Sequence, residues 1–258
     1  MEPVGRAYGR VVDLLELFAS AQHALTLTEI SSALEIPKTS VWLMLQHLIE
    51  RRFLRLTEAT KKYEIGPEFI SLAFKVSSAT NNLALIAHPF MVDASLATGN
   101  DVYIGALLGD QLTYVDKVEG VQSIRIEIGV GVTRPLHCTA AGLVHLAFAS
   151  ETFVNQALSG RLEKPTASTI TNVASIRKQL VRIRKQGYAI TNGSAIDGVK
   201  SIAVPILNCE GKIIASMSVS GPSSTMGKED THALTALKDA KRGLEELVAQ
   251  RKSPAWDV

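Results

Sequence analysis

The sequence has only two cysteines and no long apolar segment, and both absences exclude certain classes of protein. Cys138 and Cys209 are too few for a disulfide framework, which favours a protein of the reducing cytoplasm. The N-terminal residues lack the apolar segment of a signal peptide. No segment approaches the roughly 18 uncharged apolar residues that a membrane-spanning helix needs. We therefore expect a cytoplasmic protein with no membrane partner.

Excess charge is also scarce. The formal net charge is only +2, so the composition does not by itself indicate a nucleic-acid-binding protein. Acidic and basic residues are equally numerous within residues 1–80, so any attraction to phosphate must come from local clusters. Hydrophobic residues make up 46% of the 258 residues, which is enough for a buried core in one large domain or two small ones.

Residues 28–52 predict two short helices joined by a tight turn. Thr26 and Glu29 have the spacing of a capping box, so a helix should begin just after Thr26. Pro37 suits the first position of a second helix, in which apolar residues recur at helical spacing between residues 41 and 49. Such a pair is either a helix-turn-helix or an ordinary helical hairpin in a core. The outward face of the second helix would carry Thr39, Trp42, Leu43, Gln46 and Glu50.

The flanking segments favour the helix-turn-helix. Residues 10–19 have the amphipathic pattern of a helix, and residues 53–56 and 63–65 predict two strands joined by a polar turn. Three helices followed by a hairpin form the layout of a winged helix-turn-helix. Residues 51–62 contain five basic residues and one acidic residue, placed where a DNA backbone would pass. The alternative is a solvated hairpin whose lysines protect its edge.

The predicted DNA contacts lie on the second helix and the hairpin. Gln46 can make a bidentate contact with adenine, whereas Leu43 can contact only methyl groups or sugar. Residues 38–40 would meet phosphates at the helix N-terminus, and Trp42 would either contact DNA or set the helix tilt by packing. The predicted DNA-binding residues are Lys38, Thr39, Ser40, Trp42, Leu43, Gln46, Arg51, Arg52, Arg55, Lys61 and Lys62.

Residues 67–80 predict a linker helix that is apolar on nearly all sides. Such a helix must be covered, either within a core or by the same helix of a second chain. We favour a homodimer, because two copies of a helix-turn-helix generally read the two half-sites of a palindromic operator in double-stranded DNA. Residues 1–66 would then form the DNA-binding domain, and residues 81–258 a separate domain.

Residues 81–258 predict an α+β domain with a largely antiparallel sheet of about six strands. Gly109 and Asp110 indicate a hairpin turn, and residues 123–131 predict a further strand. A helix is expected directly after Pro135. Another helix, at residues 172–186, carries on its outer face five basic residues that we interpret as solvated: Arg177, Lys178, Arg182, Arg184 and Lys185.

Ser216, Ser218 and Ser220 alternate along one predicted strand, so their hydroxyl groups share one side of the sheet. Spacing alone leaves two interpretations open. The row is either the solvated face of a sheet, which is the commoner case, or the polar wall of a cavity.

An enzyme is the competing function. His137 and Cys138 are adjacent and point in opposite directions in an extended segment, which suits the activation of a thiol poorly. His88, His145 and His232 lack the spacing of metal ligands. The common motifs for hydrolysis, phosphate binding and zinc binding are absent from the sequence. We therefore expect no catalytic residues, no metal and no cofactor.

Several segments together resemble the IclR family of bacterial transcriptional regulators, in the family's order and over nearly the full length: LTEISSALEIPKTSVWLMLQHL, YEIGPEFISLA, RPLHCTAAG, KQGYA, DGVKSIAVPI and SVSGP. The resemblance implies an N-terminal winged helix-turn-helix, a linker helix and a C-terminal GAF-like effector domain. It also implies dimers, often paired into tetramers, and a small-molecule effector that changes operator binding.

The resemblance also implies a cavity at the serine row, with effector contacts at Thr139, Ala140, Ala141, Thr191, Ser201, Ser218 and Ser220. Family members commonly carry a lysine, an acid and a thiol where this chain has Leu143, Thr191 and Ser201. A neutral, hydroxyl-lined pocket suits a small or aromatic carboxylate or a related hydroxylated compound. Leu43 stands where the family commonly has arginine, so the alternative to a repressor is a ligand sensor without sequence-specific DNA binding.

Overall fold

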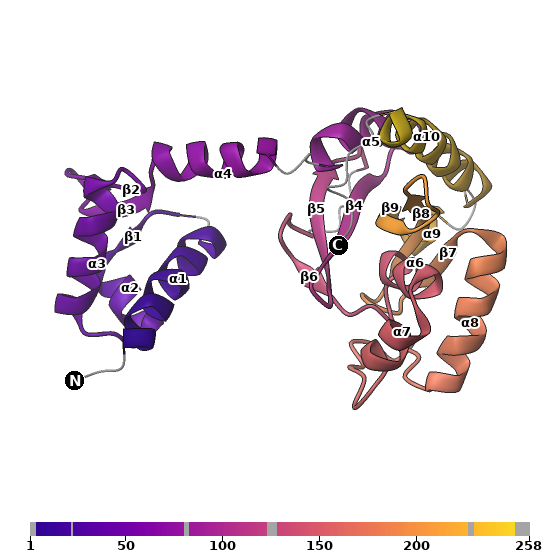
Figure 1. Ribbon diagram of the computed structural model, residues 1–258, viewed down its shortest axis with the longest axis horizontal. Coiled ribbons are helices and arrows are strands. Elements are labelled where there is room, and N and C mark those ends of the chain that lie inside the picture. The colour runs from indigo at the N-terminus through magenta and orange to yellow at the C-terminus, as the bar shows by residue number, and fades with distance from the viewer. Residues whose placement is uncertain (1–3, 22, 80–82, 123–127, 227–229, 251–258) are drawn as a thin grey trace. The chain divides into compact units, whose positions relative to one another are not determined.

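The chain forms two compact units, residues 1–81 and 82–258 (Figure 1). The computed structural model describes residues 4–21, 23–79, 83–122, 128–226 and 230–250.

The first unit is a three-helix bundle with a small antiparallel sheet, as predicted. Its helices are α1 (Val4–Ser20), α2 (Leu27–Leu34) and α3 (Lys38–Glu50), and its strands are β1 (Leu25–Thr26), β2 (Leu54–Thr57) and β3 (Lys62–Ile65). The sheet order is β1-β3-β2 (Figure 1). The core joins all three helices to the hairpin through side chains that include Leu14, Ile30, Leu45, Leu54 and Tyr63.

The capping box at the start of α2 is confirmed. The backbone N–H of Thr26 donates to Glu29 Oε2 at 2.7 Å, and the backbone N–H of Glu29 donates to Thr26 Oγ1 at 3.3 Å. These two bonds satisfy donors that a helix N-terminus leaves open. Two details were not predicted. Pro37 is the residue before α3 rather than its first residue, and the two-residue strand β1 pairs with β3.

Helix α4 (Pro67–Ala79) follows the hairpin after a single residue, Gly66. Gly66 makes this junction possible, since a Cβ atom at that position would lie 2.3 Å from the carbonyl oxygen of Arg52. The rings of Phe53 and Phe69 meet edge to face, with centroids 6.2 Å apart. The first turn of α4 therefore packs on the winged helix-turn-helix.

The second unit is built on a six-stranded antiparallel sheet with helices on both faces. The strand order is β6-β5-β4-β9-β8-β7. The strands are β4 (Asp101–Leu108), β5 (Gln111–Val118), β6 (Thr133–Arg134), β7 (Ala189–Asn192), β8 (Val199–Leu207) and β9 (Ile213–Pro222). The helices are α5 (Leu83–Thr98), α6 (Ala140–Phe148), α7 (Glu151–Ala157), α8 (Val173–Gln186), α9 (Ser223–Met226) and α10 (Asp230–Gln250).

The two faces of this sheet have separate cores. Side chains of α5 and α10 pack on the face that presents Val102, Met217 and Val219. Side chains of α6, α7 and α8 pack on the opposite face, which presents Tyr103, Tyr114 and Ala203. Figure 1 shows these helices and the strands that they cover. We call this second face the inner face.

In this unit one local prediction holds and two need correction. The hairpin turn at Gly109 is confirmed, with a positive φ of 66°. The helix expected directly after Pro135 begins only at Ala140, because residues 136–138 form a turn and Thr139 caps the helix. The strand expected at residues 123–131 lies partly outside the described residues, and residues 128–131 are not a strand.

The basic face of α8 is exposed at Lys178, Arg182, Arg184 and Lys185, as predicted, but two of its arginines also contact neighbouring elements. Arg184 donates hydrogen bonds to the carbonyl oxygens of Ala147 and Ala149 at the end of α6. Arg177 pairs with Glu151 at 3.0 Å. These two arginines tie α8 to α6 and α7, so they support the packing of the inner face.

Candidate DNA-binding and effector-binding sites

The outward face of α3 carries two large exposed apolar side chains. Trp42 is 48% exposed and Leu43 is 56% exposed, whereas Val41 and Leu45 on the opposite face are buried. Gln46 is partly buried beside them. The exposure of Trp42 shows that it is not a core residue of this unit.

The N-terminus of α3 lacks a side-chain cap. Pro37 precedes the helix and makes no capping hydrogen bond with a side chain. Lys38 and Thr39 are exposed, and Ser40 is partly exposed. Helix N-termini carry unpaired N–H groups and a partial positive charge, so this end of α3 can accept a phosphate.

Acidic neighbours reduce the free positive charge of the hairpin. Arg55 pairs with Glu64 at 3.0 Å, and Lys61 pairs with Glu58 at the hairpin turn. The hydrogen bond from Arg55 is the main cause that lowers the pKa of Glu64. The local charge that the sequence suggests is therefore partly neutralised. Two further predicted contacts, Arg51 and Arg52, are exposed after α3, and Lys62 is partly exposed.

The predicted effector residues that lie on strands, Thr191, Ser201, Ser218 and Ser220, belong to one polar band on the inner face. In the strand register Thr191 is opposite Ser201, Ser201 is opposite Ser220, and Ser220 is opposite Asp101. Ser201 Oγ and Ser220 Oγ are 2.8 Å apart. Ser218 lies two residues before Ser220 on the same side of β9 and is 2% exposed. The serine row is thus buried beneath helices, which rules out the solvated sheet face that spacing alone favoured.

Two hydrogen bonds orient α6 over this band. At one end Ser194, just beyond β7, donates from its hydroxyl to the carbonyl oxygen of Cys138 at 2.8 Å. At the other end His145 Nε2 lies 3.2 Å from the carbonyl oxygen of Gly105. Since Gly105 is opposite Ser216, the N-terminal end of α6 lies toward Thr191 and Ser220.

The N-terminal turn of α6 combines an occupied hydroxyl with open backbone donors. Thr139 caps the helix, accepting from the backbone N–H of Gly142 at 3.0 Å and donating to Pro135 O at 3.2 Å. Its hydroxyl is therefore committed. Ala140 and Ala141 are the first helical residues, whose N–H groups have no acceptor within the helix. Of the three predicted residues in this turn, these two can offer donors to a ligand.

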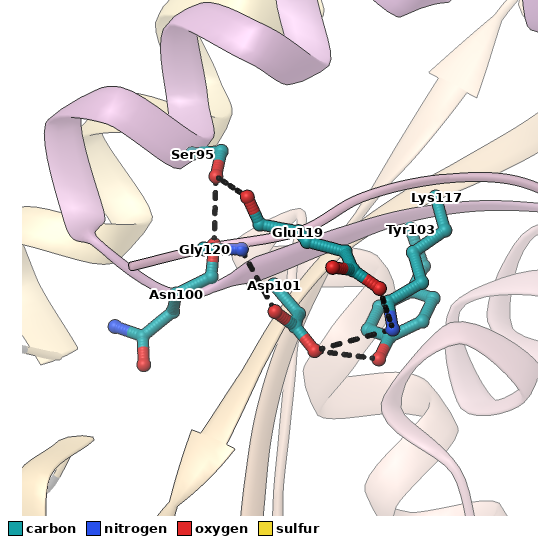
Figure 2. A network of polar contacts seen from close by, with 7 residues as sticks. All are labelled: Ser95, Asn100, Asp101, Tyr103, Lys117, Glu119 and Gly120. Atoms are coloured by element: carbon teal, nitrogen blue, oxygen red, sulfur yellow. Dashed lines mark hydrogen bonds and ion pairs between the residues drawn. The ribbon is translucent and has the colours of Figure 1, made fainter. Parts of the chain in front are cut away.

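A charged network closes one end of the band (Figure 2). Lys117 Nζ lies 3.7 Å from Asp101 Oδ2 and 3.3 Å from Glu119 Oε1. The Tyr103 hydroxyl donates to Asp101 Oδ2 at 3.1 Å, and the backbone N–H of Gly120 donates to Asp101 Oδ1 at 2.8 Å. Burial and the Asp101 carboxylate raise the pKa of Tyr103, so it stays a neutral donor. Sequence reasoning missed this network, although Asp101, Tyr103 and Lys117 share the inner face with the serines.

The enzyme alternative gains no support from the thiol. Cys138 is 1% exposed, and burial raises its pKa to about 11, the opposite of what a nucleophile needs. The neighbouring His137 points elsewhere, with Nε2 2.8 Å from the carbonyl oxygen of Glu163. Among the described residues no group of three or more His, Cys, Asp or Glu side chains could hold a metal ion. Within the same residues, no helix is long and apolar enough to cross a membrane.

The fold and the two sites define a class of protein, the winged helix-turn-helix transcription factors with a second, effector-binding domain. Residues 8–58 match the IclR helix-turn-helix domain, and residues 76–245 match the bacterial transcriptional regulator IclR C-terminal domain. The chain belongs to the IclR family of DNA-binding transcriptional regulators.

Relatives match over nearly the whole chain. The HTH-type transcriptional regulator BhcR of Paracoccus denitrificans is 32% identical over 252 residues, which cover 96% of this chain and 88% of the relative. The IclR structure from Thermotoga maritima is 26% identical, with a TM-score of 0.80 and coverage of 94% of this chain and 98% of that one. An IclR homologue from Microbacterium hydrocarbonoxydans, complexed with 4-hydroxybenzoate, is 23% identical, with a TM-score of 0.85 and coverage of 96% and 100%. This last likeness shows the fold alone.

Proposed function

We propose that the protein is a repressor that binds a palindromic operator as a homodimer and that a small-molecule effector modulates this binding. The observation that carries the proposal is the buried band of hydroxyl groups, which the N-terminus of α6 approaches. A solvated sheet face would be exposed, whereas these serines are buried beneath helices. In the first unit, the exposed Ile70 and Leu72 of α4 support a second chain as the cover of that helix.

Operator recognition would depend on α3 in the major groove. Gln46 is the side chain of the outward face that can pair in a bidentate manner with adenine, which is worth about 1–3 kcal/mol of discrimination. Trp42 and Leu43 would add apolar contacts to thymine methyl groups, and Lys38 and Thr39 would meet phosphates. The operator is therefore expected to carry A·T pairs where Gln46 reaches the bases.

A titration of the DNA beside the protein's own gene tests this assignment. Gln46→Ala should lose discrimination between the operator and a variant with its A·T pairs replaced. Arg55→Ala, which removes a proposed phosphate contact and the ion pair with Glu64 but no proposed base contact, should weaken binding to both sequences equally. Full discrimination by Gln46→Ala would contradict the role of Gln46. Failure of the unmodified protein to bind this DNA in a gel shift would favour the ligand sensor without sequence-specific DNA binding.

The effector is proposed to be a small or aromatic carboxylate or a related hydroxylated compound. The N–H groups of Ala140 and Ala141 and the helix dipole can hold a carboxylate. Thr191, Ser201, Ser218 and Ser220 offer hydroxyl groups that both donate and accept. Apolar side chains of the inner face surround these polar groups, as in most small-molecule sites.

Calorimetry with small aromatic acids tests the effector site, and 4-hydroxybenzoate is the first probe because a solved relative holds it. The double variant Ser218→Ala and Ser220→Ala should weaken binding of any acid that the unmodified protein binds. Ser175→Ala, an exposed serine on α8, is the matched control and should bind normally. Unchanged affinity in the double variant would contradict this site.

A further inference from the structure

Two cavities that share part of their lining open beside the polar band, which we call the effector band. None of the residues that line the cavities belongs to this band. Their volumes are about 440 Å³ and about 890 Å³. They are bounded by β6, the turn that leads into α6, and the loop at residues 159–165. Arg134, Arg161 and Glu163 line both. None of the predicted effector residues lines either cavity, so the two cavities are distinct from the proposed effector site.

Arg134 is the most unusual residue of this pair of cavities. It lies on β6 opposite Leu112, a buried residue of the inner face, so its side chain points to the same face. Its Nε atom is buried and has no hydrogen-bond partner among the described residues. Its positive charge opposes the effect of burial on Tyr114, whose pKa is raised to about 12. A buried N–H without an acceptor is costly, and an anionic oxygen is the acceptor that a guanidinium group favours.

The charge of the larger cavity also favours an anion. Its lining includes three cations, Arg134, Arg161 and Lys164, against one carboxylate, Glu163. Arginine presents parallel N–H groups that match the oxygens of a carboxylate or a phosphate. The partly enclosed position of Arg134 makes this attraction stronger than it would be on an open surface.

Hydrogen bonds hold in place the segment at residues 159–169, part of which lines the cavities. Thr166 and Thr169 are buried and donate to the carbonyl oxygens of Gly193 and Ser194 at 2.6 Å and 2.7 Å. His137 Nε2 donates to the carbonyl oxygen of Glu163 at 2.8 Å. The segment that carries Arg161 and Lys164 is thus tied to the residues just after β7 and to the turn before α6. A ligand would meet a largely preformed site, which lowers the entropic cost of binding.

We propose that the larger cavity binds the carboxylate or phosphate group of a small molecule. Arg134 is the principal contact, and Arg161 and Lys164 supply supporting positive charge. The site is separate from the effector band. A ligand there would join β6, the turn before α6 and the loop at residues 159–165, so it would act on the same helix N-terminus that the band faces.

Calorimetry on the full-length protein tests the proposal, with citrate and inorganic phosphate as probes at constant ionic strength. Saturable binding is expected, and Arg134→Gln should raise the Kd about tenfold or more. Lys178→Gln, which removes an exposed cation of α8, should leave the Kd unchanged. Tighter binding of citrate would indicate a carboxylate ligand, and tighter binding of phosphate a phosphorylated one.

The double variant Ser218→Ala and Ser220→Ala, here called the band variant, separates this proposal from the proposed effector site. It should bind citrate and phosphate normally, whatever its response to aromatic acids. Should Arg134→Gln fail to fold, the exposed pair Arg161→Gln and Lys164→Gln must weaken binding instead. The proposal is overturned by a lack of saturable binding, by unchanged binding in the variants of the cationic residues, or by an equal loss in the band variant.

Discussion

Acidification should destabilise the effector domain through His145. This side chain lies in α6 and is 1% exposed, with its Nδ1 atom buried and without a partner among the described residues. Burial lowers its pKa to about 4. The unfolded chain takes up a proton near pH 6.5, whereas the folded domain does so only near pH 4. Unfolding is therefore favoured as the pH falls. Linkage gives a loss of about 2 kcal/mol at pH 5 and about 3 kcal/mol at pH 4.

Urea unfolding, followed by circular dichroism at pH 7.5 and pH 5, measures this effect. Carboxylates also titrate in this range, so the comparison is with His145→Gln, which lacks only the imidazole. The substitution has its own cost at both pH values, and that cost cancels in the difference. The unmodified protein should lose about 2 kcal/mol more than the variant between the two pH values. Equal losses in the two proteins would refute the assignment of a buried, neutral His145.

Three further predictions concern the winged helix-turn-helix. Glu64→Gln should free its arginine partner for phosphate, raising DNA affinity and steepening the salt dependence by about one charge, and Glu210→Gln in the other unit should change neither. Gly66→Ala places a Cβ atom 2.3 Å from a backbone oxygen and should destabilise the unit by about 1–3 kcal/mol in thermal unfolding, whereas Gly9→Ala meets nothing within 4 Å and should not destabilise. Thr26→Ala removes half of the capping box and should cost about 1 kcal/mol in the same assay, with no loss in the effector domain.

The features that the sequence predicts correctly depend on a few neighbouring residues. The capping box needs only Thr26 and Glu29, and the hairpin turn needs only Gly109 and Asp110. The helix predicted at residues 172–186 ends where expected, because Gly187 directly after it adopts a left-handed conformation with a φ of 78°. Helical periodicity likewise identifies Ile176, Leu180 and Ile183 as the buried face of that helix. In each case the physical cause lies within one or two helical turns of the residue concerned.

The features that escape prediction depend on segments far apart in the chain. Spacing shows that Ser218 and Ser220 share a side, but the packing of α6 decides that this side is buried. Arg184 looks solvated on a helical wheel, yet it donates to the carbonyl oxygens at the end of α6, 35 and 37 residues away. The pairing of Arg55 with Glu64 follows from the strand register. These contacts are set by tertiary packing, which periodicity does not contain.

Fluorescence anisotropy with the operator, in the presence and absence of an effector, tests the central claim most directly. An acid that calorimetry shows to bind should release the unmodified protein from its operator. The double variant Ser218→Ala and Ser220→Ala should bind the same operator with unchanged affinity but fail to respond to that acid. An operator affinity that is indifferent to the bound acid, or a double variant that responds like the unmodified protein, would contradict the account.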